Sequence, residues 1–186
     1  FVVPEIVGSN LTGHPLAMLK TGIDVRVRFC YKELLKGKTD MKYYLDTEFD
    51  SYGGRLLSLA LVAENGDTRY WVFDDAFKAE NDWVRDNVLP VMLTGNMHCF
   101  VKDKEELAKC ISKFINKNTE VVIVADWLDD IKHFCDTMVF APGKSMNSKQ
   151  DISFDYSRNY GAEDSSSVPH NALYDALAIW EQAVND

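Results

Sequence analysis

From residue 42 onward the chain alternates apolar runs with turns, and this pattern predicts three successive strands. The apolar runs are 42–49, 56–63 and 68–73, and the turns between them are 51–54 and 64–67. The second turn contains Asn65–Gly66, a pair that favours a tight hairpin. The three runs therefore predict an antiparallel meander.

The next segments carry helical patterns. Residues 76–89 predict a helix that ends before Pro90, with Trp83 among the apolar positions of one face. Asp103 is a candidate N-cap for a second helix, and Glu106 stands at the capping-box position. The apolar stripe of this second helix comprises Leu107, Cys110, Ile111 and Phe114.

The rest of the chain completes an α/β order. Residues 121–125 form a continuous apolar run, as expected of a central parallel strand. A helix over 127–136 and a short strand over 138–141 follow, and the polar stretch 142–169 precedes a last amphipathic helix. Three antiparallel strands and then parallel strands, flanked by helices, is the order of an RNase H-like mixed sheet, although other α+β folds share it.

Length and composition are typical of a globular protein. Of 186 residues, 46% are hydrophobic and 26% are charged. The apolar runs are too short to cross a membrane, and residues 1–40 lack the basic-then-apolar pattern of a secretion signal. The four cysteines are scattered over Cys30, Cys99, Cys110 and Cys135, which predicts reduced, mostly buried thiols in a cytoplasmic protein. Three tryptophans are expected to pack in the core: Trp71, Trp83 and Trp127.

The first forty residues differ from the regular pattern that follows. They are rich in glycine, and only residues 23–29 alternate like a half-exposed strand. Met41 stands immediately before the first regular strand. We therefore interpret residues 1–40 as an N-terminal extension of unknown role and residues 41–186 as the main domain.

Two carboxylates lie close together in the first predicted strand. Asp46 and Glu48 project from the same face, about 7 Å apart, because side chains alternate along a strand. Two like charges at that distance among apolar neighbours favour a bound cation, for which a divalent metal ion is the usual solution. With 29 acidic residues in the chain, however, an Asp-x-Glu triplet also arises by chance.

Two later segments add the groups that such a site needs. His170 precedes Asp175 by five positions at the start of the last helix, which supplies a base and a third carboxylate. Asp126, Asp129 and Asp130 follow the buried strand, where acids at a helix start also have a purely structural explanation. Together these carboxylates and this histidine are the groups that metal-assisted hydrolysis of a phosphodiester needs.

In this order, the segments resemble the DEDDh (DnaQ-like) 3′–5′ exonucleases. Asp46-x-Glu48 matches the family's first motif and His170-x-Ala172-x-x-Asp175 its third. The resemblance covers about residues 41–184 and is strongest to small bacterial and phage exoribonucleases, whose first motif is of the type Tyr/Phe-Asp-Thr-Glu-Phe. It implies 3′–5′ polarity and the release of nucleoside monophosphates.

The middle motif of the family is an Asp at a helix start, with a polar residue four positions earlier and a bulky apolar residue four positions later. That frame selects Asp130, with Phe134 as the apolar residue, and leaves Asp126 and Asp129 as rivals. The resemblance implies a ligand set for two Mg²⁺ or Mn²⁺ ions comprising Asp46, Glu48, Asp130 and Asp175. It also implies that His170 deprotonates the attacking water. The neighbours expected to support the ligands or touch the substrate are Asp126, Thr47 and Phe49.

The net charge of −9 limits the kind of partner. Nucleic-acid binding depends on phosphate neutralisation, so an acidic chain favours a small footprint at an RNA 3′ end over a long basic groove. Two divalent ions would neutralise most of the charge on the four ligands. An exodeoxyribonuclease of the proofreading or repair type and a catalytically silent nucleic-acid-binding domain stay open as alternatives, as does a homodimer. No membrane partner is expected.

Overall fold

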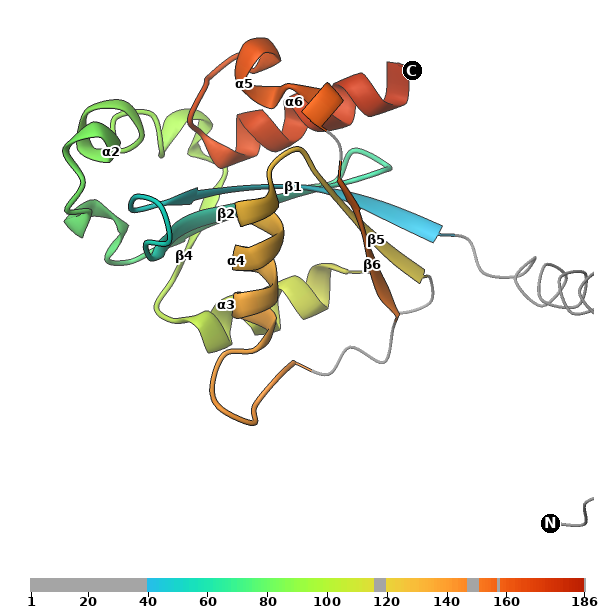
Figure 1. The fold of residues 1–186 in the computed structure, drawn as a ribbon, viewed down its shortest axis with the longest axis horizontal. Helices are drawn as coiled ribbons and strands as arrows, with labels where there is room; N and C mark the ends of the chain where they lie inside the picture. Colours follow the sequence, from blue (N-terminus) through green and yellow to red (C-terminus); the bar gives the residue numbers. More distant parts are fainter. Residues whose placement is uncertain (1–39, 116–119, 147–150, 157, 186) are drawn as a thin grey trace, which may run out of the picture. The chain divides into compact units, whose positions relative to one another are not determined.

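The structure is a computed structural model that describes residues 40–115, 120–146, 151–156 and 158–185 (Figure 1). The predictions for the N-terminal extension, including the alternating segment 23–29, therefore fall outside the described residues except at Asp40. The same holds for Cys30.

In the described part of the chain, six strands form one mixed sheet in the order β4-β3-β2-β1-β5-β6. The strands are β1 (Asp40–Phe49), β2 (Leu56–Ala63), β3 (Thr68–Phe73), β4 (His98–Val101), β5 (Glu120–Ala125) and β6 (Ile152–Tyr156). The pairs β1–β2 and β2–β3 are antiparallel, and the other neighbouring pairs are parallel. This confirms the predicted meander followed by parallel strands.

Helices cover both faces of this sheet. Figure 1 shows α6 on one side of β1 and β2, with α3 and α4 on the opposite side. The α-helices are α2 (Asp82–Asn87), α3 (Lys104–Phe114), α4 (Leu128–Met138), α5 (Ala162–Ser165) and α6 (Ala172–Asn185). Three short 3₁₀ helices are η1 (Ala76–Lys78), η2 (Thr94–Asn96) and η3 (Arg158–Tyr160). The chain is thus an α/β protein with a mixed sheet flanked by helices.

The alternation of β1 divides its side chains between these two layers. On the α3 side, the rings of Tyr43 and Trp71 meet Phe114 edge to face, with centroids 5.6 and 6.3 Å apart. The side chains of Asp46 and Glu48 point to the opposite face of β1, toward α6. The two carboxylates therefore share a face, as the strand period predicts.

Helix α3 begins as its sequence predicts. The Asp103 side chain accepts the backbone N–H of Glu106 at 2.8 Å, and the Glu106 carboxylate accepts the N–H of Lys102 at 3.0 Å. These bonds satisfy two backbone donors at the helix start. Leu107 and Ile111 of the predicted stripe are buried.

The prediction of one helix over residues 76–89 is wrong. The chain forms η1, then extended backbone at Ala79 and Asn81, and only then α2. Asn81 caps α2 by accepting the N–H of Val84 at 3.1 Å. Val84 and Val88 are buried as expected, but Trp83 is 53% exposed. Local apolar spacing predicted the buried positions and missed the break between the two helical pieces.

Other predictions also need correction. Helix α4 starts at Leu128 and continues to Met138, so the predicted strand over 138–141 is replaced by helix and an isolated bridge between Ala141 and Lys144. Strands β4 and β6 were not predicted, because both are short edge strands that carry several exposed residues. Trp71 is buried, but Trp127 is 46% exposed.

The described cysteines are free, as predicted, but they are not mostly buried. Cys99 lies exposed on the edge strand β4 and Cys135 is exposed on α4, whereas Cys110 is half-buried. None of the described helices is long and apolar enough to cross a membrane.

Candidate metal centre

Asp46 and Glu48 meet the last helix at the carboxyl end of β1. Asp175 lies in the first turn of α6, which packs on β1 and β2. One carboxylate oxygen from each of Asp46, Glu48 and Asp175 lies within 4.8 Å of the other two. Three oxygens at this spacing match the hard oxygen ligands that Mg²⁺ and Mn²⁺ prefer.

A second group of three carboxylates shares Asp46. Strand β5 runs parallel to β1, so the residues that follow it arrive at the same edge of the sheet. Oxygens of Asp46, Asp126 and Asp130 again lie within 4.8 Å of one another. Asp129 joins neither group and does not line the pocket around them. The structure therefore brings both Asp126 and Asp130 to the centre and leaves Asp129 outside.

Asp130 is held in place by the residue between the two strand acids. Its Oδ1 accepts the backbone N–H of Thr47 at 3.1 Å and the Thr47 hydroxyl at 2.6 Å. The other oxygen, Oδ2, is buried and has no hydrogen-bond partner. Thr47 thus links β1 to α4 and fixes the position of the Asp130 carboxylate in the group that contains Asp46.

Asp175 has the same arrangement. Its Oδ2 accepts the backbone N–H of His170 at 3.0 Å, and its Oδ1 is buried without a partner. Buried polar atoms are almost always satisfied, so two buried carboxylate oxygens without a hydrogen-bond partner at one site favour a ligand. A divalent cation beside Asp130 and another beside Asp175 would each give the unpartnered oxygen a ligand. The cations would also offset the repulsion among the carboxylates.

The carboxyl groups of the centre have raised pKa values. Burial raises the pKa of Asp130 to about 8, and the charge of Asp126 adds to this effect while the hydrogen bonds from Thr47 oppose it. Burial likewise raises the pKa of Asp175 to about 6. The pKa values of Asp46 and Glu48 lie well above their ordinary range, first because of burial and then because of the neighbouring carboxylates.

These shifts predict an unusual dependence of stability on pH. A carboxyl group whose pKa is higher in the folded chain than in the unfolded chain favours folding while it is protonated. The pKa values of about 6 for Asp175 and about 8 for Asp130 exceed the unfolded value of about 3.9. In EDTA, thermal melts should therefore show a Tm that falls as the pH rises from about 5 to about 8.5.

Two controls make this measurement specific. Asp130→Asn should flatten the fall, because one of the carboxyl groups with a raised pKa is gone, and saturating Mn²⁺ should raise the Tm most at the alkaline end. Asp50 does not interfere, since hydrogen bonds from two backbone N–H groups and the charge of Arg55 outweigh its burial and hold its pKa below the ordinary value. A metal-free Tm that is constant or rises over this range would show that the carboxylates are not coupled to folding in this way.

His170 lies at the edge of the same centre on strained backbone. Its φ is +65°, in the left-handed region that residues other than glycine rarely adopt. The next residue, Asn171, is fully buried: it accepts the N–H of Leu173 at 3.1 Å and donates to the carbonyl of Val91 at 2.7 Å. These bonds anchor the start of α6 and hold His170 beside Asp175. His170 belongs to neither carboxylate group.

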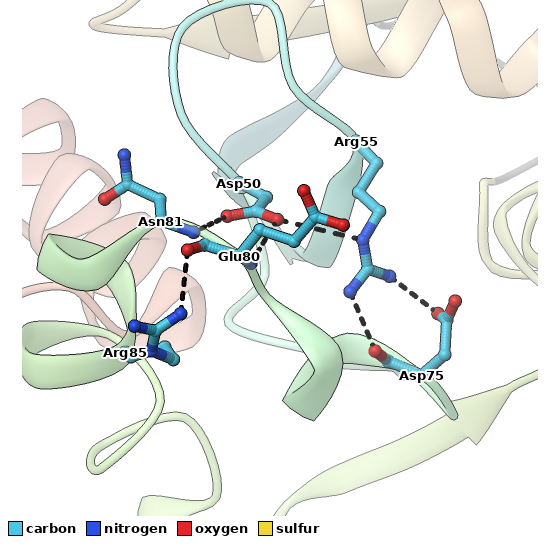
Figure 2. A network of polar contacts seen from close by, with 6 residues as sticks. All are labelled: Asp50, Arg55, Asp75, Glu80, Asn81 and Arg85. Atoms are coloured by element: carbon cyan, nitrogen blue, oxygen red, sulfur yellow. Dashed lines mark hydrogen bonds and ion pairs between the residues drawn. The ribbon is translucent and has the colours of Figure 1, made fainter.

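A polar network places α2 at the end of β1 (Figure 2). The two oxygens of Asp50 accept the backbone N–H groups of Glu80 and Asn81, at 2.8 and 3.0 Å. Arg55 lies 4.0 Å from Asp50 and forms a 2.9 Å ion pair with Asp75. The segment before α2 is thereby attached to the strand that carries Asp46 and Glu48.

This attachment brings Trp83 to His170. Their rings meet at 81°, with centroids 4.9 Å apart. Asp50 and Trp83 were not among the predicted site residues. Asp50 follows the first motif directly, but its role depends on a loop thirty residues away, and nothing in the local pattern distinguishes Trp83 from a core residue.

The centre opens into a pocket of about 290 Å³. Eleven residues line it: Asp46, Thr47, Glu48, Phe49, Trp83, Asp126, Trp127, Asp130, Ala162, His170 and Asp175. Every predicted site residue is in this set. Ala162 contributes its backbone N–H, which Asp126 Oδ2 accepts at 2.8 Å. Comparison of the sequence with known protein families gives no match, and comparison with curated proteins gives no match either.

Proposed function

We propose that this chain is a metal-dependent 3′–5′ exoribonuclease of the DEDDh type with an RNase H-like fold, which releases nucleoside monophosphates from RNA 3′ ends. The observation that carries the proposal is the pair of three-carboxylate groups that share Asp46, with His170 beside them in one pocket. The order of strands in the mixed sheet is compatible with that fold.

The ligands of the two cations would be divided between the two carboxylate groups. Glu48 and Asp175 would hold one cation with Asp46, and Asp126 and Asp130 would hold the other with Asp46. When bound, the cations activate water and stabilise the charge that develops in phosphodiester hydrolysis. Both groups lie in one pocket, so the scissile phosphate would be bound between them.

His170 would act on the proton of the attacking water. It lines the pocket but is not needed to complete either carboxylate group, so its imidazole is available as a general base. The hydrogen bond from its backbone N–H to Asp175 ties the position of this base to a proposed ligand. Trp83 packs against the ring from the α2 side.

The direct test uses 5′-labelled single-stranded RNA and DNA of one sequence, each with Mn²⁺, with Mg²⁺ and with EDTA. We expect a ladder of products shortened from the 3′ end, nucleoside monophosphates as the released species, no products in EDTA, and faster cleavage of RNA. Faster cleavage of DNA would favour an exodeoxyribonuclease. Binding without cleavage under all metal conditions would indicate a silent nucleic-acid-binding domain.

The three acids around the start of α4 should differ in importance. Asp130→Asn should lower the rate by about 10²–10³-fold, because it removes the buried open oxygen. Asp126→Asn should be milder, about 10–100-fold, because Asp126 is only half-buried and water can replace part of its contribution, whereas Asp130 is buried. Asp129→Asn should resemble the wild type, because Asp129 lies outside both groups.

Initial rates of mononucleotide release at saturating Mn²⁺ would measure this order, with Asp129→Asn as the matched control for loss of a charge at the same helix start. A larger loss for Asp126→Asn than for Asp130→Asn would reverse the assignment of the middle ligand. It would leave the exonuclease proposal in place.

A further inference from the structure

The α2 segment, residues 80–92, contacts the start of α6 at two separate places. At its amino end, the centroids of the Trp83 and His170 rings lie 4.9 Å apart. At its carboxyl end, the carbonyls of Val91 and Met92 accept hydrogen bonds from the side-chain amide of Asn171, at 2.7 and 3.3 Å. One segment therefore contacts both His170 and the residue that follows it.

His170 depends on contacts of this kind. A residue with a φ of +65° keeps that conformation only where its surroundings determine it. The bond from its N–H to Asp175 and the bonds of Asn171 hold the main chain on either side. The imidazole itself packs against Trp83 at 81°. The orientation of the imidazole therefore depends on the position of Trp83.

The position of Trp83 is in turn set by a buried carboxylate. The Trp83 ring is 53% exposed, whereas Asp50 is 9% exposed. The two Asp50 oxygens accept the backbone N–H groups of Glu80 and Asn81, the two residues that precede α2 (Figure 2). Hydrogen bonds to an ionised acceptor are stronger than bonds between neutral groups. Asp50 therefore fixes the start of α2 only two residues before Trp83.

Asp50 is ionised but is not part of the metal centre. Burial raises its pKa, but the hydrogen bonds from Glu80 and Asn81 and the charges of Arg55 and Arg85 hold the pKa below its ordinary value. Asp50 belongs to neither carboxylate group and does not line the pocket. A buried charge is costly unless it is paired, so its role lies in the contacts that it makes to the α2 segment and to Arg55.

We infer that Asp50 and Trp83 are positioning residues that hold the His170 imidazole beside the carboxylate centre. Asp50 does so by fixing the start of α2, and Trp83 does so by packing against the ring. The inference rests on the proposed function, in which His170 is the general base. In this role both residues act through His170, so their loss displaces the base and leaves the cation ligands in place.

A double-mutant cycle tests whether the two residues act through His170. Single-turnover rates would be measured with Mn²⁺ and saturating 5′-labelled RNA, so that a change in RNA affinity does not affect them. Asp50→Ala and Trp83→Ala should each lower this rate by about 10- to 100-fold, because a small displacement of a catalytic group costs that much. In the His170→Asn background, the same substitutions should change the rate less than about twofold, because the group that they position is gone.

Two further variants and a binding measurement exclude other roles. Trp83→Phe should retain most of the rate, because a phenyl ring also packs against an imidazole. Asp86→Ala is the matched control for loss of a carboxylate from α2: Asp86 is exposed, so the wild-type rate is expected. Calorimetry should show wild-type Mn²⁺ affinity in Asp50→Ala and Trp83→Ala, because neither residue belongs to a carboxylate group.

Histidine ring NMR signals of the metal-free protein give a readout that does not depend on cleavage. The His170 signal is identified by its loss in His170→Asn. Trp83→Ala should shift this signal, because the neighbouring aromatic ring is removed. Asp50→Ala should shift it in the same direction, and Asp86→Ala should leave it in place.

The outcomes separate the inference from the proposed function. Rate losses that are equally large in the wild-type and His170→Asn backgrounds, in a protein that cleaves RNA, would overturn the inference alone. An unshifted His170 signal in Asp50→Ala would also overturn it. If Asp50→Ala fails to fold, the cycle with Trp83→Ala decides, because the Trp83 ring is half-exposed. A wild type that cleaves neither RNA nor DNA would overturn the proposed function together with the inference.

Discussion

Replacing Asp46 with asparagine should abolish turnover and at the same time stabilise the metal-free protein. Asp46 is the residue that both carboxylate groups share, so its loss would weaken both proposed cation positions. We expect the rate of mononucleotide release to fall by about 10³-fold or more. The pKa of Asp46 is raised by burial and by its acidic neighbours, so a neutral amide there relieves repulsion. In EDTA at alkaline pH, the Tm should rise by about 2–4 °C for each kcal/mol gained.

The opposite signs of these two effects make the test decisive. A general disruption of the fold would lower the rate and the Tm together. Asp129→Asn should change neither, because it removes a charge from the start of α4 outside both groups. An Asp46→Asn protein that keeps more than a few per cent of the activity with Mn²⁺ would exclude Asp46 as the shared ligand.

Replacing His170 should slow the chemistry without removing the cations. Loss of a general base costs about 10²–10⁴-fold in rate. Metal binding should be retained in His170→Ala, because His170 is in neither carboxylate group. Single-turnover rates over a range of pH, with Mn²⁺ binding followed by calorimetry, would separate the two effects. The wild type and the variant should differ in the shape of their pH–rate profiles, because only the wild type has this base.

The backbone at this position calls for a second variant. His170 has a φ of +65°, a conformation that asparagine tolerates better than alanine. His170→Asn should therefore fold with less strain and still lack the base. The single-turnover rates of His170→Ala and His170→Asn should fall to a similar extent. A variant with the wild-type pH–rate profile would remove His170 from the base role.

The sequence determined the features that depend on neighbours along the chain. The period of two in β1 predicted that Asp46 and Glu48 share a face, and the capping residues predicted the start of α3 at Asp103. The apolar run at 121–125 predicted a central parallel strand, which β5 confirms. These features follow from backbone geometry and local hydrogen bonds, which a few consecutive residues specify.

Other features depend on contacts between distant segments. The break between η1 and α2 follows from the bonds that Asp50 makes to the N–H groups of Glu80 and Asn81, so periodicity within 76–89 could not show it. The exposure of Trp83 and Trp127 likewise depends on where α2 and α4 meet the end of β1. Only the tertiary structure decided that Asp126 and Asp130 both reach Asp46 while Asp129 does not, because the register of β1 with β5 and the Thr47–Asp130 bonds set those distances.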